Sequence, residues 1–122
     1  MFKSLAKLFH RKPQLPPPHV RTTQEGIQVM RGGEKLSLVR WCEVKKIIAY
    51  KYALYTTDEV CVAFLTQKDA DSWLEINEDW EGFREATDQM VSLFPSIPKD
   101  WFCNVSIPAF ERKETVLYEE SS

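Results

Sequence analysis

The chain has few of the residues from which most catalytic and metal sites are built. Its two histidines, His10 and His19, lie in or beside a proline-rich segment, so we expect neither a zinc site nor a histidine-dependent catalytic pair. Its three cysteines, Cys42, Cys61 and Cys103, are widely spaced and form no C-x-x-C pair. Because each has apolar neighbours, we expect buried, reduced thiols with a structural role and no bound metal.

Several sequence patterns are also absent. No apolar run approaches the ~20 residues of a membrane-spanning helix. Lysines and Ser4 interrupt the segment Phe2–Phe9, so a secretory signal is not expected. The chain has no phosphate-binding G-x-x-x-x-G-K, no dinucleotide-binding G-x-G-x-x-G and no G-x-S-x-G nucleophile motif. We therefore expect a cytoplasmic protein, with no cofactor and no enzymatic activity.

What is present is the composition of one globular domain, with 43% hydrophobic and 28% charged residues in 122. The stretch Trp41–Leu65 organises it. Val44–Tyr50 predicts one strand, and the nearly all-apolar run Val60–Thr66 predicts a central strand buried on both faces. Between them, Lys51–Glu59 reads as a polar connection rich in tyrosine.

Shorter strands precede this hairpin. Val20–Thr23 and Ile27–Arg31 alternate around a turn, and Gly32-Gly33 predicts a second turn into Lys35–Val39. The period of two predicts that four apolar residues share the core face: Ile27, Val29, Leu36 and Leu38.

The residues after the hairpin predict one long helix and several short elements. A strand is expected at Trp73–Ile76, and a helix at Trp80–Phe94 with Asp79 as its N-cap and Pro95 at its end. The later elements are a helical turn, an extended segment and a last short pairing, at Pro98–Phe102, Val105–Phe110 and Thr115–Tyr118.

Strands followed by one amphipathic helix predict an α+β fold. We expect a curved antiparallel sheet of about five to seven strands, with the early hairpins added at one edge and one C-terminal helix as a cap. This order resembles pleckstrin-homology-like domains. Residues 19–118 would form the domain, residues 1–18 a basic tail and proline-rich spacer, and residues 119–122 a frayed tail.

The basic tail has two interpretations. Met1–Lys12 places its apolar residues on one helical stripe, which is typical of a short helix lying on an anionic membrane surface. It could equally be a frayed segment, because an isolated helix of this length is marginal in water. The residues that would contact a membrane are Phe2, Lys3, Leu5, Lys7, Leu8, Phe9, Arg11 and Lys12. The protein would then be peripheral to the inner face of the membrane.

Charge is unevenly distributed along the chain. Residues 1–21 carry five basic side chains and no acidic one, whereas residues 58–122 carry fifteen acidic and five basic side chains. An acidic sector argues against direct nucleic-acid binding and favours a basic protein partner. The predicted contact residues are Tyr55, Asp58, Glu59, Asp69, Asp71, Trp73, Glu75, Glu78, Asp79, Trp80, Glu81 and Glu85. The alternative is that both tryptophans belong to the core and the acids only keep the protein soluble.

Basic residues on the early strands offer a different site, a pocket for a lipid head group. The candidates are Arg31, Lys35, Arg40, Lys45, Lys46 and Lys51. Lys45 and Lys46 are adjacent, so they point to opposite faces of a strand and cannot both line one pocket. A solvated outer face is the simpler interpretation of these cations.

One spaced pattern covers roughly Ile27 to Tyr118. It consists of Trp41, Glu43, Val44, Ile47, Ala49–Lys51, Thr57–Glu59, Trp73–Ile76, Glu78, Gly82, Phe83, Phe94-Pro95, Ile97-Pro98, Asp100-Trp101 and Pro108–Phe110. The pattern resembles a family of small bacterial proteins associated with toxin–immunity loci. The resemblance implies an immunity protein that binds and neutralises a cognate toxin inside the producing cell. Its apolar and turn positions are expected to determine the fold rather than to contact the toxin.

Overall fold

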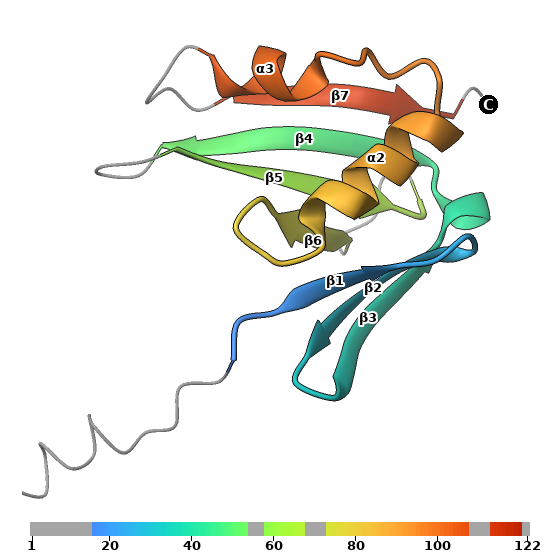
Figure 1. The fold of residues 1–122 in the computed structure, drawn as a ribbon. Helices are drawn as coiled ribbons and strands as arrows, with labels where there is room; N and C mark the ends of the chain where they lie inside the picture. The colour runs from blue at the N-terminus through green and yellow to red at the C-terminus, as the bar shows by residue number, and fades with distance from the viewer. Residues whose placement is uncertain (1–15, 54–57, 68–72, 108–112, 121–122) are drawn as a thin grey trace, which may run out of the picture.

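The computed structural model of the chain describes residues 16–53, 58–67, 73–107 and 113–120. Seven strands in these residues form two antiparallel sheets (Figure 1). Sheet A has the order β1-β2-β3, with β1 at His19–Thr22, β2 at Gly26–Arg31 and β3 at Glu34–Arg40. Sheet B has the order β6-β5-β4-β7, with β4 at Lys46–Ala53, β5 at Asp58–Leu65, β6 at Leu74–Asn77 and β7 at Lys113–Glu119. The expected α+β class is confirmed.

The hairpin of β4 and β5 is the centre of sheet B. Its pairing runs from Lys46 opposite Leu65 to Ala53 opposite Asp58. β5 lies between β4 and β6, and every side chain from Val60 to Leu65 is at most 5% exposed. The prediction of a central strand buried on both faces is therefore confirmed. β7 returns to pair with the free side of β4 and reaches Glu119, one residue into the segment expected to be a tail.

The early strands do not extend that sheet. They form sheet A, so the expected hairpins at one edge of a single sheet are wrong. The two sheets share one hydrophobic core, which includes Val20 and Ile27 from sheet A and Val62 from sheet B. Trp41, in the short 3-10 helix η1 (Trp41–Glu43), joins them: its indole donates a 3.1 Å hydrogen bond to the Thr23 carbonyl and packs edge-on against Phe64.

The predicted core face of sheet A is correct for β2 and wrong for β3. Ile27 and Val29 are buried, but Leu36 and Leu38 are 47% and 43% exposed. The register explains this, because Ile27 pairs with Val39, so Val39 takes the core position and Leu38 turns to the opposite face.

The helices also differ from the expectation. α2 spans Phe83–Leu93, and α3 (Trp101–Ser106) and β7 follow it, so α2 is not the last element; both helices lie in front of sheet B in Figure 1. Asp79 is not its N-cap. The Asn77 side chain accepts a 2.8 Å hydrogen bond from the Asp79 amide, and this local turn delays the helix until Gly82.

Other boundaries near the C-terminus are shifted. Trp101 starts α3, so the helical turn predicted at Pro98–Phe102 begins later and runs on to Ser106. Val105 and Ser106 are thus helical and not extended, because their amides continue the α3 ladder; residues 108–112 lie outside the described ones.

Lys51 is the charged residue of the core. It is 0% exposed, and its ammonium donates a 2.9 Å hydrogen bond to the carbonyl of Ser106, at the end of α3. The last carbonyls of a helix have no intrahelical partner, so this contact satisfies a buried donor and a free acceptor together. Lys51 cannot therefore serve the head-group pocket that the sequence offered.

Gly82 lets β1 approach the start of α2. The Val20 amide donates a 2.7 Å hydrogen bond to the Glu81 carbonyl, which fixes sheet A against the turn that follows β6. Gly82 has φ of 91°, and a Cβ there would lie 2.0 Å from the Val20 carbonyl oxygen. Both the backbone angle and the close approach exclude a side chain.

We expect Gly82→Ala to lower the free energy of unfolding by about 2 kcal/mol or more, because the new methyl group must displace β1. Gly33→Ala is the control, since nothing lies within 4 Å of a Cβ there. Urea denaturation of both variants measures the difference. Equal stability of the two would show that β1 does not dock as described.

Candidate protein-binding surface

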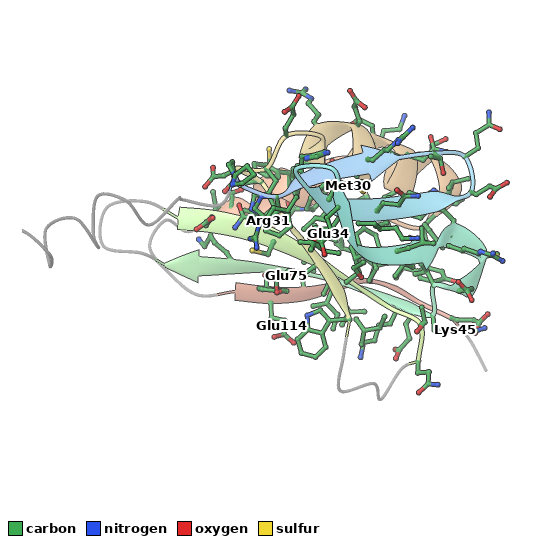
Figure 2. The ribbon with its side chains drawn as sticks, turned by 90° about the horizontal axis from the view of Figure 1, so that it is seen from below. Met30, Arg31, Glu34, Lys45, Glu75 and Glu114 are labelled. Atoms are coloured by element: carbon green, nitrogen blue, oxygen red, sulfur yellow. The ribbon has the colours of Figure 1, made fainter. Side chains whose placement is uncertain are left out.

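The side of sheet B turned away from the core carries most of the polar residues of its strands. Ala49, Val62 and Ile76 point into the core, so their neighbours along each strand point to the other side. We call this side the acidic face and define it by Ile48, Tyr50, Glu59, Cys61, Trp73, Glu75, Asn77, Glu114 and Val116. Figure 2 shows Glu75, from β6, and Glu114, from β7, pointing to this side of the sheet.

Hydrogen bonds order the carboxylates of the acidic face. The Tyr50 hydroxyl donates to Glu75, and the Asn77 amide donates to Glu59. Tyr50 and Asn77 are the cross-strand neighbours of Cys61 on either side, so the thiol lies within this network. The carboxylates are therefore held by strand residues rather than by flexible loops.

The titration of Cys61 reports the negative potential of the acidic face. Burial, together with the charges of Glu75, Glu59 and Glu78, raises the pKa of the Cys61 thiol from 9.0 to about 12. A hydrogen bond from the thiol to Glu75 acts in the same direction. The thiol therefore lies in a buried position with a negative electrostatic environment.

Lys46 also points to this side of sheet B, where it pairs with Glu119 rather than with the carboxylates of the acidic face. The ion pairs among the described residues join Lys45 to Glu120 and Lys46 to Glu119, at 3.0 and 3.7 Å. In the described parts of the chain, no lysine or arginine forms an ion pair with Glu59, Glu75 or Glu114. An uncompensated cluster of this kind attracts a cationic partner.

Exposed apolar side chains lie beside the carboxylates. Trp73 and Val116 are each 50% exposed, and Ile48, which pairs with Val116, is half-buried. A large aromatic side chain next to exposed aliphatic ones can bury apolar area against a partner. The acidic face therefore combines an anchor with charge.

The predicted contact residues divide into several groups in the structure. Glu59, Trp73 and Glu75 share the acidic face. Asp79, Glu81 and Glu85 are exposed on the turn before α2 and on α2 itself, and so do not belong to this face. Tyr55, Asp69, Asp71 and the side chain of Asp58 lie outside the described residues.

Glu78 has a structural role that the sequence did not reveal, and Trp80 has the core role that was the alternative to surface contact. A Glu78 carboxylate oxygen accepts a 2.7 Å hydrogen bond from the Val60 amide, just beyond the last pair of β5 and β6. Trp80 packs against the core, so the alternative interpretation holds for this tryptophan and not for Trp73.

Glu78 and Trp80 also line a pocket of about 510 Å³ between the turn after β6 and the two helices. Its walls are Glu78, Trp80, Gly82, Phe83, Arg84, Thr87, Asp88, Lys99, Trp101 and Phe102. Aromatic rings make the walls, and charged groups of both signs surround them, so the pocket favours neither anions nor cations.

Tyr50, Glu114 and Val116 were not among the predicted contacts. Tyr50 and Val116 lie in the strands predicted at Val44–Tyr50 and Thr115–Tyr118, and Glu114 directly precedes the second of these. Only the pairing of Ile48 with Val116 and of Tyr50 with Glu114 places them on one face.

No family model, no curated protein and no solved structure matches this chain. None of the described helices has the length and apolar character needed to cross a bilayer. Within the described ranges, no group of three or more histidine, cysteine, aspartate or glutamate side chains is arranged to hold a metal ion. The acidic face is therefore interpreted from its own geometry, without a related protein for comparison.

The cysteines differ from one another. Cys61 is 1% exposed, as predicted, but Cys42 and Cys103 are exposed, so the expectation of three buried thiols is wrong for these two. Cys42 lies in η1 at the junction of the sheets and Cys103 on the outer side of α3, where apolar neighbours in sequence do not imply burial.

We expect a thiol reagent to modify Cys42 and Cys103 in the native protein and Cys61 only after unfolding. Because the folded pKa of Cys61 is raised, its contribution to stability is complete below pH 9 and is lost as the pH rises toward 12. Ellman titration with and without denaturant measures the accessible thiols. Rapid reaction of all three thiols in the native state would contradict this arrangement.

Proposed function

We propose that this protein is an immunity-type inhibitor that binds a basic protein, a cognate bacterial toxin, through the acidic face. The observation that carries the proposal is the set of uncompensated carboxylates, Glu59, Glu75 and Glu114, around exposed Trp73 and Val116. The carboxylates would steer the partner and pair with its lysines and arginines, while Trp73 would enter a hollow on the partner.

The way the face is built supports a binding role. Surface carboxylates on long flexible side chains lose rotamer entropy when a partner orders them, whereas Glu59 and Glu75 are already held by Asn77 and Tyr50. Preorganised charges on a sheet favour a rigid, specific interface.

The resemblance to proteins of toxin–immunity loci supports the choice of partner. Many toxins act on nucleic acid and are basic, so a surface that carries fixed negative charge can take the place of their substrate. A pleckstrin-homology-like arrangement would fit the same family. The pleckstrin-homology-like arrangement and the absence of enzymatic activity are both parts of the proposal.

Glu114→Lys tests the electrostatic part of the proposal. Glu114 is exposed and has no ion pair with the cations that the structure describes, so the change should weaken the complex by about 1–2 kcal/mol at low salt and less at high salt, without lowering the melting temperature. Glu25→Lys makes the same charge change in the β1–β2 turn and should leave affinity unchanged. Glu78→Lys would be a poor choice, because it also breaks the hydrogen bond to Val60.

The binding measurement uses the protein expressed with the products of its neighbouring genes. Co-purification at low and high salt identifies the partner, and calorimetry then compares the variants. Trp73→Ala should cost about 2 kcal/mol or more of binding free energy if Trp73 is the anchor. A stable complex that neither Glu114→Lys nor Trp73→Ala weakens would overturn the proposal for this face.

A further inference from the structure

The outer side of sheet A has the opposite character to the acidic face. Ile27, Val29 and Val39 point into the core, so the alternate residues point outward. Arg21, Lys35 and Arg40 are exposed there, and none of the strand residues that the structure describes on this side is acidic. We call this side the basic face and define it by Arg21, Met30, Lys35, Leu36, Leu38 and Arg40.

Aliphatic side chains lie among these cations. Leu36 and Leu38 are 47% and 43% exposed on β3, which is an edge strand of sheet A. Met30, half-buried on β2, pairs with Lys35. Figure 2 views the molecule from the side of sheet A and labels Met30. Two exposed leucines on one edge strand offer apolar area that a partner can bury.

Pro16, the first described residue, lies beside the β2–β3 turn of this sheet, where a Cβ on Gly32 would be 4.0 Å from the proline ring. The sequence before it, MFKSLAKLFHRKPQL, contains Lys3, Lys7, Arg11 and Lys12 together with several large apolar side chains.

We propose that the basic face is a second binding surface, which lies on an anionic lipid bilayer. Arg21, Lys35 and Arg40 would contact lipid phosphates, and Leu36 and Leu38 would enter the boundary between head groups and acyl chains. A single short amphipathic segment binds membranes weakly and reversibly, so stable attachment needs a second contact. The basic face supplies that contact and orients the domain.

The chemistry of the face favours lipid over nucleic acid. Proteins that bind single-stranded nucleic acid stack bases on aromatic rings, and the strand residues described on this side include no phenylalanine, tyrosine or tryptophan, only the imidazole of His19 opposite Met30. Aliphatic side chains interleaved with cations suit a lipid interface, where both the charge and the apolar area are used. Each sheet packs its apolar side against the shared core. The basic face of sheet A and the acidic face of sheet B therefore point in different directions.

The test is co-sedimentation of the full chain with vesicles of phosphatidylcholine, alone or mixed with phosphatidylserine. We expect binding only to the mixed vesicles. Lys35→Glu with Arg40→Glu should reduce the partition coefficient at least about 20-fold, since each cation near an anionic surface contributes about fivefold. Leu36→Ser with Leu38→Ser should reduce it about tenfold.

The control is Arg84→Glu with Lys99→Glu, which reverses two exposed cations on the helix side of the molecule and should leave sedimentation unchanged. Thermal melting checks that every variant is folded. Equal sedimentation of the basic-face variants and the unaltered chain would show that the N-terminal segment binds alone and would overturn the proposal. Absence of binding to mixed vesicles would overturn it too, as would binding of an RNA oligonucleotide through the basic face without binding to vesicles.

Discussion

The close contact of β1 with Glu81 and Gly82 determines how the two sheets are arranged. Sheet A has only three strands and cannot bury its apolar side alone. The hydrogen bond from the Val20 amide to Glu81, and the absence of a side chain at Gly82, bring β1 against the turn that starts α2. Sheet A then closes over the same core as sheet B, and each sheet is left with one outer side.

Those two outer sides carry opposite charge. On sheet B, Glu59, Glu75 and Glu114 form no ion pair with a cation that the structure describes, and they share their side with a half-exposed tryptophan. On sheet A, three cations lie among exposed leucines. A protein attached to an anionic surface by its basic face would present the acidic face to the solution. Membrane attachment and capture of a basic protein are therefore compatible in one small domain.

Local sequence predicted the elements better than their arrangement. The apolar run Val60–Leu65 could only suit a central strand, and Gly32-Gly33 marked a hairpin, because both signals depend on neighbours in sequence. The register of β3 could not be predicted, since the pairing of Ile27 with Val39 and the bulge after Val29 decide it. The Asn77 turn likewise competes with the helix N-cap in a way that only the fold resolves.

The candidate site was predicted only in part, because the sequence does not reveal which strands pair. Glu59, Trp73 and Glu75 were identified from composition, and alternation along β5 and β6 places them together. Glu114 and Val116 are distant in sequence and join them only through the pairing of β7 with β4. Glu78 was predicted as a surface contact, yet its carboxylate accepts a hydrogen bond from a backbone amide, and of the two interpretations of Trp80 the core one holds.

The measurement that tests the charge segregation most directly is the near-surface electrostatic potential, obtained by NMR. It compares the relaxation of backbone amides caused by cationic and by anionic nitroxide probes, and it needs neither a toxin nor a membrane. The cationic probe should relax the amides of β6 and β7 more strongly, and the anionic probe those of β2 and β3. The same ratio of the two effects on both sheets would contradict the account.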